Sequence, residues 1–392
     1  MNTVPFDIDD PRLAAAAWSR LAEPGDEVAG TLVAHLGTSG ALAWLLKQHH
    51  GVQSEALAAG VARWSTRLPD LDARRDLRAL DLLGGTLLLP DDPRWPAGLR
   101  DLGVGSPFVL WVRGDPDLAA ACRRMVALVG ARAATGYGEH VARKMAAGLS
   151  DRGFGVVSGG AYGIDAAAHH GILVAGGHTL AVLAGGVDQL YPRGNHNLLT
   201  KIIHRGAIIA EMPPGAAPHK QRFLSRNRLI AALADATVVV EAAWRSGALS
   251  TARHAAALLR PVGAVPGPVT SMTSGGCHQL LRDGLAVCVT DAAEVAELAG
   301  STSDVAEAPA GELRAIDDLD PIARAVLDAL PLRASIDTDS LLRDAGHPLP
   351  GVLGALGLLE LRGLIEADGA RWRRKRASAV TSGRKGVDHT GF

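Results

Sequence analysis

Short apolar segments alternate with helix-length segments from residue 125 onward, and this alternation restricts the fold more than any other feature of the chain. The apolar segments are rich in Val, Leu, Ile and Ala, and they are MVALVG (125–130), FGVVSGG (154–160), TLAVLAGG (179–186), AIIAE (207–211), ATVVVEA (236–242) and VGAVPG (262–267). Buried strands that alternate with helices form parallel sheets with right-handed crossovers. The pattern therefore predicts an α/β fold with a doubly wound parallel sheet.

The turns that follow these strands indicate where a ligand would bind. Four of them are rich in glycine or small polar residues, at 130–132, 158–160, 185–186 and 246–247. In open α/β sheets, ligands bind beyond the carboxyl ends of the strands. We therefore expect these turns to converge on one site.

The remaining sequence predicts further parts on both sides of the sheet. At 392 residues the chain is long enough for two or three domains. We predict a helical domain at 1–80, the α/β domain at 81–298, a small, polar and acidic linker at 299–314, a winged helix at 315–376 and a basic, disordered tail at 377–392.

Periodicity and turn chemistry support these boundaries. Apolar residues recur at three- and four-residue spacing in the first part, with a break at 35–40 (HLGTSG). Two strand-like runs, 86–89 and 108–112, open the α/β domain. The winged helix is predicted from three helical segments and a hairpin, at 321–330, 337–346, 350–365 and 366–374. Because the third helix carries only Arg362 as a cation, protein contact is favoured over reading of duplex DNA.

Charge and cysteine content exclude several classes of protein. The net charge of −1 excludes a uniformly basic protein, so a nucleic-acid site would need local segregation of charge. Cys122, Cys277 and Cys288 lack CxxC spacing and indicate neither a disulfide framework nor a zinc site. The N-terminal residues are acidic, unlike a signal peptide, and no apolar run approaches about 18 residues. We expect a soluble, cytoplasmic protein with no membrane partner.

The segment 154–170 (FGVVSGGAYGIDAAAHH) has the form of an anion site. A buried strand leads into a turn with Gly159, Gly160 and Gly163, and Asp165 lies in the first turn of a helix. Free N–H groups and the helix dipole favour an anion at such a place. A plain strand-to-helix turn is an equally good interpretation of this segment alone.

Basic residues are concentrated between Met212 and Arg282. The acids of this region are Asp235 and Glu241, and its cations are Lys220, Arg222, Arg226, Arg228, Arg245, Arg253, Arg260 and Arg282. Such segregation suits a polyanion. Ser225 could cap a helix and leave Arg226, Asn227 and Arg228 in its first turn, although either arginine could instead form a buried salt bridge. Phe223 is either a core aromatic or a platform for an unstacked base.

No catalytic constellation emerges from the sequence. The segment 130–138 (GARAATGYG) is not GxGxxG, and GK[ST] does not occur. Asp165 and His169 could form a dyad, but a helix-stabilising ion pair is the simpler explanation, and Ser158 has no nucleophile-elbow context. We expect neither enzymatic activity nor a metal or cofactor. A phosphoribohydrolase-like enzyme that handles nucleotides is the alternative.

Together, the motifs resemble the DNA-processing protein A family (DprA, also called Smf). The resemblance covers about residues 86–290, and its motifs occur in the family's order: LPDDPRWPAGLRDLGVGSPFVLWVRG (89–114), VGARAATGYG (129–138), SGGAYGIDAAAH (158–169), GVDQLYPRGN (186–195), FLSRNRLIAALADATVVVEA (223–242), SGALSTARHA (246–255) and VPGPVTSMTSGGCHQLLRDG (265–284). The N-terminal helices resemble the family's sterile-alpha-motif-like domain, and many members carry a C-terminal winged helix.

This resemblance implies a Rossmann-like, homodimeric protein without catalytic activity. Such a protein binds and protects single-stranded DNA, with weak sequence preference, and loads RecA recombinase in natural transformation and homologous recombination. The residues that the resemblance and the charge pattern assign to DNA binding are Gly130, Arg132, Ser158, Gly159, Gly160, Lys220, Arg222, Phe223, Arg226, Asn227, Arg228, Ser246 and Gly247. The chain departs from the family pattern at Ala131 (usually serine), Leu224 (commonly proline) and Cys277 (commonly asparagine).

Overall fold

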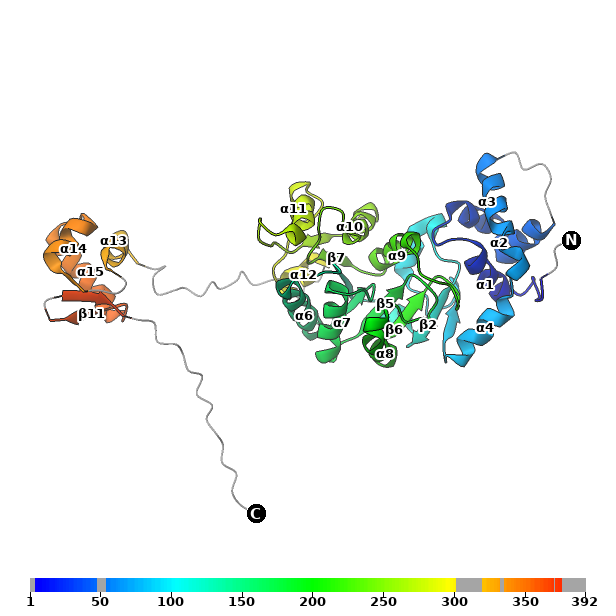
Figure 1. The fold of residues 1–392 in the computed structure, drawn as a ribbon, viewed down its shortest axis with the longest axis horizontal. Helices are drawn as coiled ribbons and strands as arrows, with labels where there is room; N and C mark the ends of the chain where they lie inside the picture. Colours follow the sequence, from blue (N-terminus) through cyan, green and yellow to red (C-terminus); the bar gives the residue numbers. More distant parts are fainter. Residues whose placement is uncertain (1–3, 48–53, 301–318, 332–334, 370, 376–392) are drawn as a thin grey trace, which may run out of the picture. The chain divides into compact units, whose positions relative to one another are not determined.

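The chain divides into two units, Met1–Ala306 and Glu307–Phe392, which are described separately. The computed structural model describes residues 4–47, 54–300, 319–331, 335–369 and 371–375 (Figure 1). The predicted linker beyond residue 300 and the predicted basic tail lie outside the described residues.

A nine-stranded sheet forms the centre of the first unit. Its strands are β1 (Thr86–Leu88), β2 (Leu110–Gly114), β3 (Met125–Val129), β4 (Gly155–Ser158), β5 (Thr179–Leu183), β6 (Ala207–Ala210), β7 (Ala236–Val239), β8 (Val262–Ala264) and β9 (Val287–Cys288). The order across the sheet is β1-β2-β6-β5-β4-β3-β7-β8-β9. The strands from β3 to β9 pair in parallel, whereas β1 pairs with β2 and β2 with β6 in antiparallel fashion.

This sheet confirms the predicted α/β class, because all six predicted strands are present and pair in parallel. The strand β9 was not predicted: it is only two residues long and both residues are exposed, although it lies within the short apolar run 285–289 (LAVCV). The strand order reverses between β3 and β7, because the chain adds β4, β5 and β6 on one side of β3 and later adds β7 and β8 on the other. This topological switch point is where doubly wound sheets place their ligands.

Helices cover both faces of the sheet (Figure 1). One face carries α6 (Gly136–Asp151), α7 (Ile164–Val174), α8 (His196–Arg205) and α12 (Ala292–Leu298), and the other carries α9 (Lys220–Ala232), α10 (Ala248–Ala257) and α11 (Gly275–Arg282). Successive strand residues pack on opposite faces: Val126 and Leu128 meet α6 and α7, whereas Ala127 and Val129 share a core with α9 and α10. The strands therefore read as continuous apolar runs. The short helices are α5 (Leu118–Ala121), η1 (Leu68–Asp70), η2 (Ala97–Gly105), η3 (Arg193–Asn195) and η4 (Met272–Ser274).

Four N-terminal helices pack beside β1 and β2 in the same unit (Figure 1). They are α1 (Pro11–Leu21), α2 (Glu27–Leu46), α3 (Glu55–Ser65) and α4 (Ala73–Leu82). Trp18 meets Trp64 edge to face at 5.3 Å, and Trp111 of β2 donates its indole N–H to the Ser19 hydroxyl at 3.2 Å. These buried contacts join the helices to the sheet; their assignment as a sterile-alpha-motif-like domain stays a prediction.

The helix α2 is long and apolar enough, by length and composition, to cross a membrane. The backbone of Gly37 is not helical (φ 70°, ψ 167°) and divides α2 within the break predicted at 35–40. Beyond the kink, Ala41, Leu42 and Leu45 are buried in the core that α2 shares with α1. The α2 helix thus packs within the N-terminal helical layer.

The second unit contains the predicted helices and hairpin. Its elements are α13 (Pro321–Ala329), β10 (Ile336–Asp337), α14 (Thr338–Ala345), α15 (Leu349–Leu361), β11 (Ile365–Asp368) and β12 (Arg371–Arg374), with the sheet order β10-β12-β11. The α15 helix ends four residues before the predicted end at 365, because Gly363 adopts a φ of +70° and Ile365 begins a strand. The winged-helix assignment of this unit stays a prediction.

Asp165 and His169 form neither the dyad nor the ion pair considered from the sequence. The hydroxyl of Thr179 donates to the carbonyl of Val156 at 2.8 Å, so its oxygen accepts from the protonated Nδ1 of His169, also at 2.8 Å. Asp165 instead accepts hydrogen bonds from backbone amides of its own glycine turn. Both side chains are buried, and burial lowers the pKa of His169 to about 3.

The close approach of α2 to η2 generates a stability prediction. A Cβ at Gly30 would overlap the carbonyl oxygen of Val104, whereas a Cβ at Gly40, farther along α2, would make only an ordinary contact with Leu36. We expect Gly30→Ala to lower the free energy of unfolding by about 1–3 kcal/mol. Gly40→Ala should leave it unchanged or raise it by up to about 1 kcal/mol. Urea titration measures both, and equal stability of the two variants would contradict this packing.

The low pKa of His169 generates a second stability prediction. Between its ordinary pKa of 6.5 and its folded value of about 3, the unfolded chain binds a proton that the folded chain does not. Stability should therefore fall as the pH falls from about 6.5, by up to about 1.4 kcal/mol per pH unit for this one group. In His169→Asn, whose amide N–H can replace Nδ1–H, that part of the pH dependence should disappear. Urea titrations at several pH values test this, and unchanged slopes would refute it.

Candidate nucleic-acid interface

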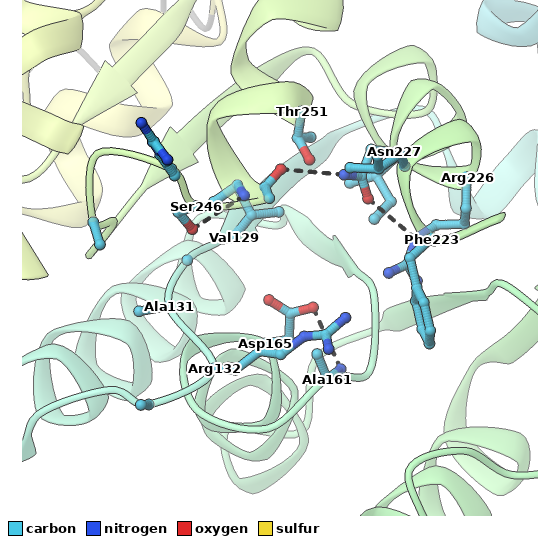
Figure 2. Close-up of a pocket in the computed structure, with 18 of the residues that line it drawn as sticks. Val129, Ala131, Arg132, Ala161, Asp165, Phe223, Arg226, Asn227, Ser246 and Thr251 are labelled. Carbon is cyan, nitrogen blue, oxygen red and sulfur yellow. Dashed lines mark hydrogen bonds between the residues drawn. The ribbon is translucent and has the colours of Figure 1, made fainter. Parts of the chain in front are cut away.

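A cavity of about 700 Å³ opens beyond the carboxyl ends of β3 and β7, at the topological switch point. Its wall combines the loops after β3, β4 and β7 with one face of α9 (Figure 2). Figure 2 shows Arg132 and Asp165 on one side of this cavity and Phe223, Arg226 and Asn227 on the other. The predicted convergence of loops is thus confirmed for the loops after β3 and β7.

Glu241, at the end of β7, holds the loop that follows β3. Its backbone carbonyl accepts from the N–H of Ala131 at 2.7 Å, and its carboxylate accepts from the N–H and hydroxyl of Thr135 at 2.9 and 2.6 Å. A Cβ at Gly138 would overlap this carboxylate, so a larger residue there would displace it from Thr135. Within the described residues, no acceptor binds the backbone N–H groups of Arg132 and Ala133, which line the cavity.

Asp165 lies on the cavity floor and occupies the glycine turn that was predicted to bind an anion. Its Oδ2 accepts from the N–H of Gly159 at 3.1 Å and of Ala161 at 3.4 Å. Burial raises the pKa of Asp165, and the Arg226 guanidinium opposes that shift. The turn therefore binds the carboxylate of its own helix, and the Gly159 N–H is not free for a phosphate.

Arg226 lines the cavity but is buried and fixed. Its Nη1 donates to the carbonyls of Gly159, at 2.9 Å, and of Val182, and its Nε donates to Asn227 Oδ1 at 3.3 Å. Burial lowers its pKa to about 10. Asn227 in turn donates its side-chain N–H to the carbonyl of Gly247 at 3.2 Å. Two neighbouring side chains of α9 thus bind three backbone carbonyls, those of Gly159, Val182 and Gly247.

The expected helix start at Ser225 is wrong. The helix α9 begins at Lys220 with His219 at its N-cap, so Arg226, Asn227 and Arg228 lie in its middle and are buried. The helix starts earlier because 219–232 contains neither glycine nor proline and is rich in helix-forming residues. The dipole argument for an anion beside these arginines therefore does not apply.

Two predicted DNA-binding arginines lie outside the cavity lining and are neutralised by acids from elsewhere in the sequence. Arg228 forms the buried salt bridge that was considered from the sequence, with Glu211 at 2.7 Å. Arg222 pairs with Glu23, between α1 and α2, at 2.8 and 2.9 Å. These pairs correct the charge-segregation argument, because a sequence window does not include distant acids.

Three exposed cations surround the opening of the cavity: Arg132, Lys220 and Arg245. None of them forms an ion pair with another residue that the structure describes. The Arg132 guanidinium lies over the ring of Phe223, 4.9 Å from its centroid, and Tyr191 contacts the same ring at 5.8 Å. Phe223 is only half-buried and lines the cavity, which excludes the core-aromatic interpretation.

The predicted residues thus separate into two groups. Those that line the cavity are Gly130, Arg132, Lys220, Phe223, Arg226, Asn227, Ser246 and Gly247. Those outside the lining are Ser158, Gly159, Gly160, Arg222 and Arg228. Ser158 is fully buried, and its hydroxyl donates to the Leu128 carbonyl at 2.6 Å. Its side chain therefore links β4 to β3 within the sheet.

The sequence prediction missed several lining residues, chiefly Arg245 and Thr251. Arg245 belongs to the basic region already noted, and its place three residues after the predicted strand 236–242 was a usable signal. Thr251 had no signal, because it reaches the cavity only through the packing of α10. Among the described residues, no group of three or more His, Cys, Asp and Glu side chains is placed to hold a metal ion.

Comparison with known proteins places this chain in a family. The model of the DNA recombination-mediator protein A family matches residues 86–300. A putative DNA processing protein DprA from Mycobacterium tuberculosis (strain ATCC 25618 / H37Rv) is 44% identical over 390 residues, 97% of this chain and 98% of that protein. Protein Smf of Escherichia coli (strain K12) is 33% identical over 352 residues, 86% of this chain and 91% of that protein.

A solved structure agrees with the sequence comparisons. The X-ray structure of DNA processing protein A (DprA) from Streptococcus pneumoniae is 29% identical, has a TM-score of 0.58 and covers 72% of this chain and 94% of that one. These matches confirm the resemblance carried by the motifs and the Rossmann-like fold. The chain therefore belongs to the DNA recombination-mediator protein A family, the DprA/Smf proteins.

Proposed function

We propose that this protein binds single-stranded DNA in the cavity at the switch point and acts on DNA during transformation or homologous recombination. The observation that carries the proposal is a group of exposed cations, Arg132, Lys220 and Arg245, that form no ion pair with any described residue and lie around the half-buried Phe223. Unpaired exposed cations beside an aromatic ring match the two needs of a single strand, phosphate neutralisation and base stacking. The family's description as a recombination mediator supports the same role.

In this proposal, different parts of the cavity contact the phosphate backbone and the bases of the DNA strand. Phosphates would contact the rim cations and the backbone N–H groups of Arg132 and Ala133, for which no described residue supplies an acceptor, and one base would enter the cavity against Phe223. Because Arg132 covers one face of that ring, a base on that face would displace the guanidinium or stack on it. Stacking and phosphate contacts tolerate any sequence, so we expect weak sequence preference.

We extend the proposal to RecA loading on the basis of the family resemblance and the names of the relatives. The proteins from M. tuberculosis and S. pneumoniae are named DNA processing proteins, and the family model describes a recombination mediator. In this proposal the protein holds the strand and transfers it to RecA, without chemistry of its own.

A nucleotide-handling enzyme is the alternative, and the Asp165 carboxylate on the cavity floor favours it. Its Oδ2 is already bound by two backbone amides, and Arg226 faces it. That arrangement fixes the carboxylate as a structural anion, which is why we prefer binding. Turnover of a nucleoside monophosphate that is lost in Asp165→Asn would favour the enzyme instead.

We propose that the protein is a homodimer through the β9 edge of its sheet. The outer edge of β9 pairs with no described strand. Val287 is 52% exposed and Leu285 42% exposed, and Cys288 is also exposed. An apolar, unpaired sheet edge is a surface on which a second chain can add.

The second unit fits protein contact better than DNA contact. Leu349, Leu353 and Leu361 lie at four- and eight-residue spacing along α15 and are exposed. The cation on this segment, Arg362, stands at its C-terminal cap. A duplex-reading helix carries polar and basic side chains on its exposed face, whereas this face is apolar.

We place the protein in the cytoplasm. Cys122, Cys277 and Cys288 are free thiols, as expected in a reducing compartment. Burial raises the pKa of Cys122 and Cys277 to about 12, so neither is poised to react.

Removing single rim cations tests the proposed site. We expect Lys220→Ala and Arg132→Ala each to weaken oligo(dT) binding about tenfold and to reduce the slope of log K against log salt by about 0.7, because each loses one phosphate contact. Fluorescence anisotropy at several salt concentrations measures both quantities. The same variants should slow RecA filament formation on the strand.

Two controls sharpen that test. Lys144 is an exposed lysine on α6 outside the cavity lining, so Lys144→Ala should bind as the wild type does. Arg222→Ala should leave the salt slope unchanged, because Arg222 is paired with Glu23. An unaltered slope in Lys220→Ala and Arg132→Ala would show that the proposed cavity is wrong.

A further inference from the structure

All three tyrosines of the chain are exposed beyond the carboxyl ends of the strands, where the cavity also lies. Tyr137, Tyr162 and Tyr191 are each 47% exposed, and they stand in the segments that follow β3, β4 and β5. Two of them, Tyr162 and Tyr191, lie on the α8 side of the cavity, after neighbouring parallel strands. Neither lines the cavity.

Hydrogen bonds fix Tyr162 to the loop that carries Tyr191. The Tyr162 hydroxyl accepts from the N–H of Gly194 at 3.2 Å, and a Cβ at Gly194 would meet the tyrosine ring. Asn195 donates to the carbonyls of Gly160 and Ala161, both at 3.0 Å. The two loops are thus bonded to each other, and the Tyr162 ring is held in place by its hydroxyl without a ligand.

Tyr191 continues the aromatic surface from Phe223. Their ring centroids are 5.8 Å apart with planes inclined at 47°. A base stacked between two rings needs a separation of about 7 Å, twice a van der Waals contact, so no base fits between these two. A base that stacks on Tyr191 must therefore use the ring face turned away from Phe223, and Tyr162, in the loop bonded to that of Tyr191, is the next exposed ring.

The charge of the two loops that carry Tyr162 and Tyr191 suits a phosphate backbone. Arg193, two residues after Tyr191, is exposed and forms no ion pair with any described residue. Loop 184–196 has a single carboxylate, Asp188, which accepts the N–H of Gly215 at 2.9 Å. Loop 159–163 has none. Within these two segments, an anion would meet the Arg193 cation, and the one carboxylate present already accepts a backbone N–H.

We propose that Tyr162, Tyr191 and Arg193, which we name the tyrosine ledge, form a second single-strand subsite that continues from the cavity. The inference rests on the proposed function. One base occupies the cavity beside Phe223, the next bases stack on Tyr191 and Tyr162, and Arg193 neutralises the phosphates between them. The ledge thereby lengthens the bound segment and gives its direction across the sheet edge, from α9 towards α8.

Binding of oligo(dT) strands of increasing length tests the ledge. We expect Tyr191→Ala and Tyr162→Ala each to weaken binding of a strand of about 12 nucleotides roughly tenfold, and to change binding of a strand of about four nucleotides less than about twofold. Tyr191→Phe and Tyr162→Phe should bind normally, because stacking needs only the ring, whereas Tyr191→Leu should lose affinity although it keeps apolar volume. Arg193→Gln should reduce the salt slope by about 0.7 for the long strand only.

Tyr137→Ala is the matched control. Tyr137 is equally exposed at the same sheet edge, but its hydroxyl donates to the carbonyl of Pro266 at 2.9 Å, towards β8 and away from the ledge. The Tyr137→Ala variant should bind the short and the long oligo(dT) strand as the wild type does. Unchanged long-strand binding in the ledge variants, with Lys220→Ala still impaired, would overturn the ledge alone. An equal loss for short and long strands, or in Tyr137→Ala, would also overturn it. A wild type that binds no single strand would refute the proposed function itself.

Discussion

The buried guanidinium of Arg226 is the interaction on which the site depends. Burying a cation is unfavourable unless its donors are satisfied, and here the carbonyls of Gly159 and Val182 and the amide oxygen of Asn227 satisfy them, with the Asp165 carboxylate nearby. These contacts fix α9 against the carboxyl ends of β4 and β5. Lys220 and Phe223 lie six and three residues earlier on the same helix, so they project together at the cavity opening.

The buried Arg226 also determines how charge is distributed between the floor of the cavity and its opening. The floor holds one anion and one cation that compensate each other, Asp165 and Arg226, and both are buried. The rim holds Arg132, Lys220 and Arg245, which are exposed and unpaired among the described residues. An added phosphate is therefore attracted to the opening of the cavity rather than to its floor. The glycine turn shapes the floor but binds its own helix's carboxylate.

The sequence was sufficient to predict the central strands of the sheet, but it did not show which charged side chains form ion pairs in the fold. Strands such as β3 and β7 were predictable because burial on both faces requires continuous apolar runs. The strand β9 lies in a short apolar run, 285–289, but it is only two residues long and exposed, so it was missed. Arg222 and Arg228 were assigned to DNA because their partners, Glu23 and Glu211, come from other segments and meet them only in the fold. Family resemblance identified Lys220 and Phe223, whereas Glu241, which holds the β3 loop, emerged only from hydrogen-bond geometry.

Photo-crosslinking measures most directly whether a single strand lies in the cavity beside Phe223. A single-stranded oligonucleotide with 5-iodouracil is irradiated on the full-length protein, and the modified residues are mapped by mass spectrometry. We expect adducts at Phe223, which lines the cavity, and at Tyr191, whose ring contacts that of Phe223. Adducts confined to the second unit, or to the outer face of α6, would contradict it.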